Sequence, residues 1–187
     1  MNLQALIEQP YELLLELERR AKAAIAARQG ADVAAEEWVG VAFRLGAERF
    51  VTARSEVREI LPVPEALTRV PGAKPWLRGI ANIRGQLLTV ADLRSFLGAG
   101  RAQLDRHARL LLAASRDVPT ALIVDEVLGF RRFGDDERSE RPPATVIRCE
   151  HYLDGGFRRG TEVWPRFSLE RLLEDEQFLN AGEQVNA

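Results

Sequence analysis

The sequence predicts a mostly β fold of two small five-stranded β-barrels with short helices, preceded by an N-terminal helical arm. Many short apolar runs separated by regular turns are typical of small barrels and sandwiches. Val90–Leu97 and Arg166–Leu173 repeat one pattern: a strand end, a capping residue, a leucine, two polar residues and an apolar pair. The capping residues Asp92 and Ser168 are 168 − 92 = 76 residues apart, which indicates two related halves, each closed by a short element.

Residues 1–36 are predicted to form the arm and a linker, and residues 37–187 the β-rich domain. Apolar residues in the arm recur at steps of three and four, as on one face of an amphipathic helix. These residues are Leu3, Leu6, Leu13, Leu17, Ala21 and Ala24, with Pro10 at a position that suits a first helical turn. Three alternatives stay open for this helix: it packs on the body, it docks a partner, or it is a weakly ordered tail.

Apolar alternation and chain breakers predict the elements of the body. Alternating apolar residues over 39–45 predict a half-buried strand, and prolines between 62 and 75 mark an irregular connection. Further strands are expected at 50–53, 56–60, 109–114, 120–125, 127–133, 145–148 and 163–167. Ser168 is expected to cap a last helix whose apolar face contains Leu169, Leu172 and Leu173.

The most informative segment is Gly79–Leu93, in which two short apolar runs flank an Asn-x-Arg-Gly corner. Each run has the length of a strand, and Gly85 supplies the backbone freedom that a tight reversal needs. Arg84 occupies the corner itself. Asp92 stands where a helix N-cap belongs, ahead of a short apolar helix that Gly98 terminates.

Composition limits the classes of function. The chain has 187 residues and a formal net charge of −2, whereas generic nucleic-acid binding favours a strongly basic face. Only Lys22 and Lys74 are lysines, so 26 − 2 = 24 basic residues are arginine, which suits bidentate contacts with carboxylates. Cys149 is the only cysteine, and we find neither a signal peptide nor a membrane-spanning run. We therefore expect a soluble, cytoplasmic protein without membrane insertion.

No catalytic or metal-binding constellation is recognisable. His107 and His151 are the only histidines, and Cys149 with His151 would give two ligands where a zinc site needs more. Gly155–Thr161 has the glycine spacing of a phosphate loop but has threonine in the place of the lysine, so we interpret it as a flexible turn. The sequence predicts a non-enzyme without cofactor or metal.

The Gly79–Leu93 segment resembles the signature of the CheW-like adaptor domain of bacterial chemosensory systems. That signature often contains Gly-(Val/Ile)-x-Asn-(Leu/Ile)-Arg-Gly, then a hydrophobic strand and Asp-Leu; here Gly79, Asn82, Arg84 and Gly85 match it. Ala121–Gly129 resembles a second family strand that ends in Val-Asp-x-Val. The resemblance covers about residues 37–173 and implies the double-barrel architecture.

Three features depart from the family pattern: Thr89, where proline is common, Ser168, where aspartate is common, and the strand near Phe50, which is less like the usual Tyr-Gly-Ile pattern. They weaken an assignment to swimming motility. The arm, with Pro10–Leu14, resembles the pilus-associated branch of the family, the PilI-type twitching-motility proteins.

The resemblance implies a scaffold that couples the cytoplasmic tip of a transmembrane chemoreceptor to the regulatory domain of a CheA-type histidine kinase. It implies receptor or kinase contact for Val57 and Glu59, and receptor coupling for Gly79 and Arg84. Ala121 matches a position in a groove for the receptor tip. The full set of predicted partner-binding residues is Val57, Glu59, Gly79, Asn82, Arg84, Gly85 and Ala121. The resemblance also implies recruitment to receptor arrays, which can be polar.

Structural explanations stay open beside these roles. Arg84 could clamp a neighbouring carboxylate or loop carbonyl, Val57 could pack in the core, and Glu59 could be a neutral edge charge. Two other classes of function also stay open. They are a structural or polar-targeting module without a kinase partner, and a small β-barrel that binds nucleic acid.

Overall fold

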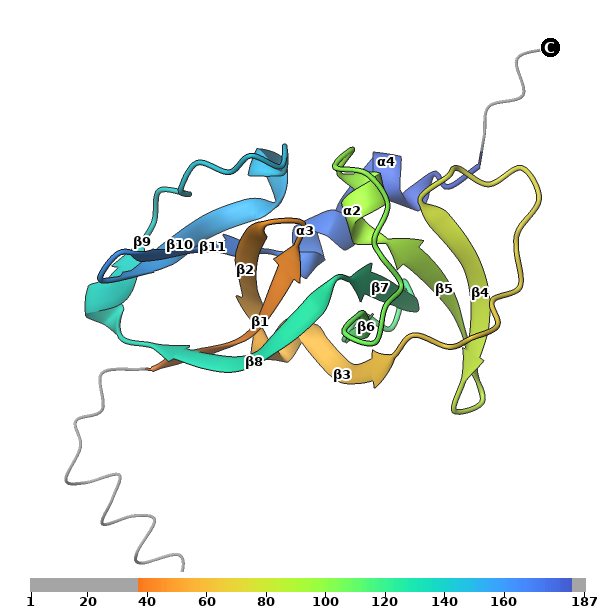
Figure 1. Cartoon of the computed structure of the whole chain (residues 1–187), viewed down its shortest axis with the longest axis horizontal. Helices are drawn as coiled ribbons and strands as arrows, with labels where there is room; N and C mark the ends of the chain where they lie inside the picture. The colour runs from red at the N-terminus through yellow and green to blue at the C-terminus, as the bar shows by residue number, and fades with distance from the viewer. Residues whose placement is uncertain (1–36, 183–187) are drawn as a thin grey trace, which may run out of the picture. The chain divides into compact units, whose positions relative to one another are not determined.

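The computed structural model describes residues 37–182, which form two mixed β-sheets (Figure 1). The predicted helical arm, residues 1–36, lies outside the described residues, so the prediction about it stays a prediction. In the described part no helix is long and apolar enough to cross a membrane.

Sheet I has the strand order β8–β1–β2–β11–β10–β9, and sheet II has the order β3–β6–β7–β5–β4. The strands of sheet I are β1 Trp38–Leu45, β2 Glu48–Ala53, β8 Glu126–Phe133, β9 Arg138–Ser139, β10 Leu153–Arg159 and β11 Glu162–Phe167. Those of sheet II are β3 Val57–Pro62, β4 Leu77–Ile83, β5 Gln86–Asp92, β6 Arg109–Ala113 and β7 Thr120–Val124. The mostly β prediction is confirmed, with the two-residue β9 as a sixth strand on sheet I.

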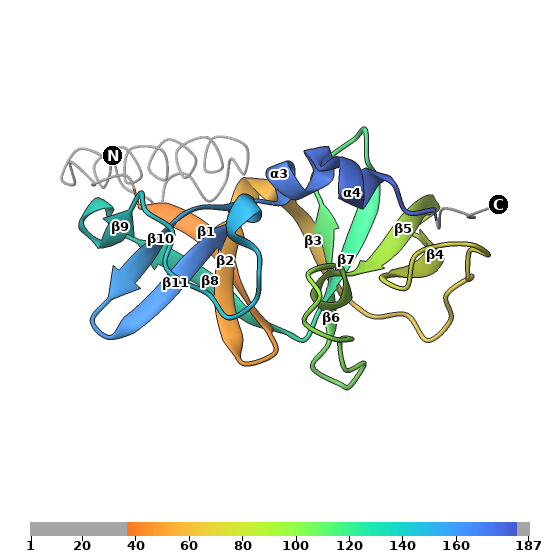
Figure 2. The same ribbon diagram turned by 90° about the horizontal axis from the view of Figure 1, so that it is seen from above.

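Short helices link the strands or follow the last of them. The α-helices are α2 Leu93–Phe96, α3 Leu169–Glu174 and α4 Glu176–Leu179, and the 3₁₀ turns are η2 Arg54–Glu56, η3 Asp135–Glu137 and η4 Glu150–Tyr152. Figure 2 shows the two sheets next to each other, with α3 and α4 along one side of them. Asp92 and Ser168 cap α2 and α3 as predicted, because their side chains accept hydrogen bonds from the backbone N–H of Ser95 and Arg171.

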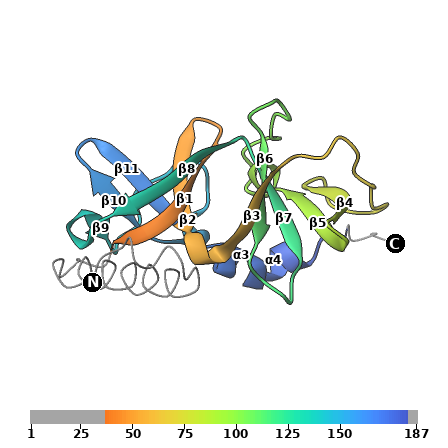
Figure 3. The ribbon, with the colours of Figure 1, turned by 90° about the horizontal axis from the view of Figure 1, so that it is seen from below.

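The two sheets exchange strands. β3 follows β2 in the chain but joins sheet II, and β8 follows β7 but joins sheet I (Figure 3). Each sheet therefore combines strands from both halves of the sequence. In each, the strand that precedes the capped helix supplies a parallel pair, β5 with β7 and β11 with β2.

A central core lies between the sheets and a smaller core lies within each. Along β6 and β7 successive residues alternate between them: Leu110 and Ile123 pack within sheet II, while Leu111 and Leu122 join the central cluster. Because both faces of these strands are buried, their sequences are continuously apolar rather than alternating. Stacked and edge-on rings of Phe43, Phe50 and Phe167 fill the central cluster on the sheet I side.

The predicted strand at 145–148 is wrong. The backbone N–H groups of Val146 and Ile147 donate to the carboxylate of Glu48 at 2.8 and 2.7 Å, instead of joining a strand ladder. The apolar pattern of this segment buries Ile147 but leaves Val146 in solvent.

The interpretation of Gly155–Thr161 as a flexible turn is also wrong for most of its length, because residues 155–159 belong to β10. Gly155 and Gly156 allow neighbouring segments to pack closely against β10. A Cβ on Gly155 would lie 2.6 Å from the carbonyl oxygen of Ser139 in β9, so the close approach of these strands requires glycine.

Candidate functional site

The Arg-Gly corner is a two-residue hairpin turn between β4 and β5. Ile83 pairs with Gln86, and both corner residues have positive φ, 53° for Arg84 and 81° for Gly85. Asn82 supports the turn, because its Oδ1 accepts a hydrogen bond of 2.9 Å from the Gly85 N–H. Turns of this kind favour Asn-Gly or Asp-Gly.

Arg84 is the only non-glycine residue with positive φ among residues 37–182. The left-handed conformation costs a residue with a Cβ about 1–2 kcal/mol. The side chain remains 69% exposed, so burial does not compensate this cost. Strain of this kind tends to collect at functional sites.

The guanidinium of Arg84 forms an ion pair with Glu59, its Nη2 lying 2.7 Å from Oε1. Glu59 belongs to β3, and β3 and β4 are the two edges of sheet II. Beside this pair, Arg58 donates a 2.7 Å hydrogen bond to the side chain of Gln86. The corner of the β4–β5 hairpin therefore reaches the opposite edge of the sheet. An exposed pair stabilises a fold by at most about 1 kcal/mol, so this contact leaves Arg84 accessible to a partner.

The structure brings five of the seven predicted residues together at this edge: Glu59, Asn82, Arg84 and Gly85 at the corner, and Val57 at the start of β3. Val57 is 3% exposed and packs in the central core. Its side chain thus presents little surface in this chain.

Gly79 and Ala121 lie elsewhere in sheet II. A Cβ on Gly79 would lie 2.4 Å from the carbonyl oxygen of Thr68, which bridges to Ile80 through two backbone hydrogen bonds. This glycine lets the connection after β3 pack against β4. Ala121 is fully buried in β7, within the sheet II core.

A hollow of about 570 Å³ adjoins the corner, and Val57, Arg58 and Gln86 contribute to its lining. Sequence reasoning missed its arginines, Arg54, Arg58 and Arg116. Only one of them had a signal in the sequence: Arg58 lies on β3 between Val57 and Glu59, two residues that were predicted to bind a partner. Arg116 comes from a loop 58 positions further along, so only the fold places it nearby.

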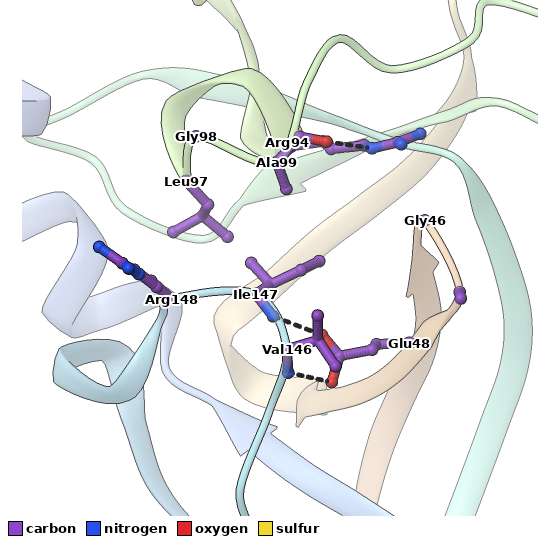
Figure 4. A pocket seen from close by; sticks show the side chains of 10 residues that line it. Gly46, Glu48, Arg94, Leu97, Gly98, Ala99, Val146, Ile147 and Arg148 are labelled. Atoms are coloured by element: carbon purple, nitrogen blue, oxygen red, sulfur yellow. Dashed lines mark hydrogen bonds between the residues drawn. The ribbon is translucent and has the colours of Figure 1, made fainter.

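A larger hollow of about 600 Å³ lies between the β1–β2 turn, α2 and residues 146–148 (Figure 4). Leu97 and Ile147 face each other across it, and the Glu48 carboxylate holds the 146–148 segment in place. Arg94 borders it, and its Nε donates to the carbonyl of Ala99 at 2.8 Å. None of the predicted partner-binding residues lines this hollow.

Groups with catalytic or metal-binding potential do not converge. No three His, Cys, Asp or Glu side chains within residues 37–182 are placed to hold a metal ion. Cys149 is buried, and burial raises the pKa of its thiol to about 11, so it is a poor nucleophile at neutral pH. His151 is the middle residue of η4, and it is exposed.

Residues 39–177 match the CheW-like domain family. The chain belongs to this family. It is 35% identical to Protein PilI from Pseudomonas aeruginosa over 176 residues, which cover 94% of this chain and 98% of that protein. It is 32% identical to Protein FrzA from Myxococcus xanthus, over 59% of this chain and 69% of that one.

A solved structure of the scaffolding protein TtCheW from Thermoanaerobacter tengcongensis shows the same fold. The TM-score is 0.65 at 23% identity, over 75% of this chain and 95% of that one. Proteins of the CheW-like family are non-catalytic scaffolds, so the prediction of a non-enzyme is confirmed. The predicted assignment to this family is confirmed as well.

Proposed function

We propose that this protein couples the cytoplasmic tip of a chemoreceptor to a CheA-type histidine kinase in a chemosensory system that controls type IV pilus twitching motility. The observation that carries the proposal is the corner residue Arg84. It is strained and exposed, and it pairs with Glu59, the other charged residue to which the family resemblance assigns a partner contact. Asparagine, aspartate or glycine would make this position of the turn with less strain than arginine does.

Similarity supports the choice of system. The match to Protein PilI extends over nearly all of both chains, including the region of the arm, whereas the match to the Bacillus subtilis chemotaxis protein CheW covers 60% of this chain. This favours the pilus-associated branch over swimming. In this proposal the protein works in the cytoplasm at membrane-associated receptor arrays, without cofactor or nucleic acid.

The test is Arg84→Glu. We expect a thermal melt only slightly below that of the parent, because the exposed pair with Glu59 that is lost stabilises the fold by at most about 1 kcal/mol. We expect assembly with receptor and kinase to be defective, because inverting a charge across an interface can cost several kcal/mol. Arg101→Glu, at another exposed arginine without a partner in the described residues, is the matched control.

A stable Arg84→Glu protein with normal ternary assembly and normal kinase control would remove Arg84 from the site. A melt lowered by the equivalent of roughly 3 kcal/mol would identify it as a structural clamp on Glu59.

A pull-down from cell lysate separates the classes of function. Recovery of a CheA-type kinase with the full chain supports the adaptor. Recovery of polar or pilus components without kinase supports a targeting module. A deletion strain that twitches normally would contradict the assignment to twitching motility.

A further inference from the structure

Two neighbouring hollows, one of which adjoins the corner, carry opposite charge. The first, which we call the basic hollow, is lined by Arg54, Arg58 and Arg116 and by no acidic residue. The second, the acidic hollow, is lined by Glu56, Asp117, Glu170 and Glu174 and by no basic residue. Both include Ala114 and Ser115, so only this short segment separates them. A chain with a net charge of −2 therefore places three positive and four negative groups side by side.

The charges of the basic hollow have no carboxylate partner within residues 37–182. Arg54 donates to the backbone carbonyl of Val57 and lies over the Phe130 ring at 5.8 Å, and Arg58 donates to Gln86. Arg116 has no hydrogen bond or ion pair in this part of the chain. All three side chains are exposed, and Phe130 beside them is 55% exposed. The hollow thus combines guanidinium donors with an apolar neighbour.

The acidic hollow also holds uncompensated charge. Glu170 and Glu174 are exposed residues four positions apart on α3, where like charges destabilise a helix. Arg171 lies between them in sequence but donates to the carbonyl of Leu153. Glu56 is turned inward, its Oε2 accepting from Thr52 and from the Leu169 N–H.

We propose that the basic hollow binds carboxylate side chains of a receptor helix, and that the acidic hollow repels carboxylates and so fixes the direction in which this helix lies. The inference rests on the proposed function and adds the charge order of the bound segment. Acidic groups contact Arg54, Arg58 and Arg116, and a neutral or basic stretch follows over α3.

Carboxylates are the occupant that the chemistry of the basic hollow favours. Guanidinium groups form bidentate, charge-assisted hydrogen bonds with carboxylates. The repulsive neighbour supplies specificity, since a segment in the reverse direction would place its carboxylates against Glu170 and Glu174. The hollow is also continuous with the corner, through Gln86 and Arg58.

Three variants of the full chain test the proposal. Arg58→Glu with Arg116→Glu makes the basic hollow acidic and changes the net charge to −2 − 4 = −6. Glu170→Arg with Glu174→Arg makes the acidic hollow basic and changes it to −2 + 4 = +2. The fourfold variant inverts the charge order at the original net charge of −2. The control is Arg101→Glu with Arg148→Glu, at exposed arginines that line neither hollow.

The measurements are the Kd for a cytoplasmic hairpin fragment of a chemoreceptor from the same organism and the Kd for the kinase regulatory domain. We expect receptor binding to weaken at least tenfold in the first variant, with kinase binding and the control changed less than twofold. In the fourfold variant we expect the fragment to bind in the reverse direction. The second variant should bind the fragment without directional preference, which spin-label distances from the fragment to α3 would detect. If a charge-reversed protein has an altered melt, Arg58→Gln with Arg116→Gln replaces it, with a smaller loss expected.

Several outcomes would overturn the proposal. Recovery of receptor binding in the fourfold variant with the fragment in its original direction would mean that net charge alone matters. Unchanged receptor binding in the first variant would exclude the basic hollow, while leaving the adaptor function intact. Loss of a dimer in that variant, seen by light scattering, would identify a second copy as the occupant instead. Failure of the unmodified chain to bind the receptor fragment at all would refute the proposed function itself.

Discussion

The two hairpin–helix units of this protein, β4–β5–α2 and β10–β11–α3, repeat the same construction with different chemistry. Each second strand makes a parallel pair with the neighbouring sheet strand, and each is followed by a side-chain-capped helix. Even the irregularities agree, because register shifts occur after Leu77 in one unit and after Leu153 in the other, 153 − 77 = 76 residues apart. Fold requirements therefore account for what the units share.

What differs is the corner. Arg84 in the first unit corresponds to Gly160 in the second, since 160 − 84 = 76, and their φ angles are 53° and 59°. The two turns are not identical, because Gly85 at the next position has a φ of 81° whereas Thr161, its counterpart, does not have a positive φ. In both units the first corner residue is left-handed, and the second unit makes it with glycine, which avoids the strain of a Cβ, so arginine is not needed for this conformation.

The largest expected effect is a difference in the stability lost when each of the two capping residues is replaced by alanine. Asp92 is fully buried, accepts from Ser95 and Ala102, and pairs with Arg78 at 3.4 Å, whereas Ser168 accepts only from Arg171. We expect Asp92→Ala to cost about 3–5 kcal/mol, because it leaves buried partners unpaired. Ser168→Ala should cost about 1 kcal/mol, the usual value for a lost cap.

Denaturant unfolding of both variants checks this difference. Equal losses would show that Asp92 acts as a simple cap and that its contacts with Ala102 and Arg78 add nothing.

The next largest effect tests a feature that the two units share, a glycine that lies close to the backbone of a neighbouring segment. Gly79 and Gly155 both have positive φ, and a Cβ would meet a carbonyl oxygen at 2.4 Å in one case and 2.6 Å in the other. Gly79→Ala and Gly155→Ala should each cost about 1–3 kcal/mol through backbone strain and displacement of the neighbouring segment. Gly72→Ala, where φ is also positive but the space is open, should cost less, and chemical denaturation should rank the three. A loss in Gly72→Ala as large as in the other two would remove the close approach as the cause.

Arg84→Gly and Gly160→Arg exchange the residues at the two corners, and we expect them to change the free energy of unfolding by about 1 kcal/mol in opposite directions. Arg84→Gly relieves the strained φ and should raise stability, while Gly160→Arg introduces the same strain into the second unit and should lower it. We expect Arg84→Gly to weaken assembly with receptor and kinase despite its higher stability. Calorimetric melts and the assembly assay check this trade-off, and a destabilised Arg84→Gly protein would mean that the Glu59 pair outweighs the strain.

The smallest expected effect is the pH dependence of stability that comes from an ion pair next to the corner of the β10–β11 hairpin. The Arg159 guanidinium hydrogen-bonds the Glu137 carboxylate and lowers its pKa from 4.5 to about 2. Because the folded-state pKa is depressed, the pair stabilises the fold above about pH 4.5 and this contribution is lost as pH falls toward 2. Glu137→Gln should lower stability by less than about 1 kcal/mol at neutral pH, with the difference vanishing near pH 2. A difference that persists at pH 2 in urea titrations would assign the effect to something other than charge.

Local patterns predicted much of the fold and part of the site. Alternation identified the strand β1, and capping chemistry identified Asp92 and Ser168, because these signals depend on neighbours within a few residues. The corner residues Asn82, Arg84 and Gly85 were recognised for the same reason. The 145–148 strand failed because Glu48, almost a hundred positions away, takes its backbone donors.

By itself, the sequence determined the family, the mostly β class, the repeated hairpin–helix units and the unusual arginine at one corner, since each is written in contiguous residues. Only the tertiary structure decided that β3 and β8 exchange sheets, that Glu59 is the partner of Arg84, and that Arg116 joins Arg54 and Arg58 opposite an acidic hollow. These contacts join segments far apart in the chain. Their pairing depends on which strands become edges and which loops meet, and local propensity does not encode that.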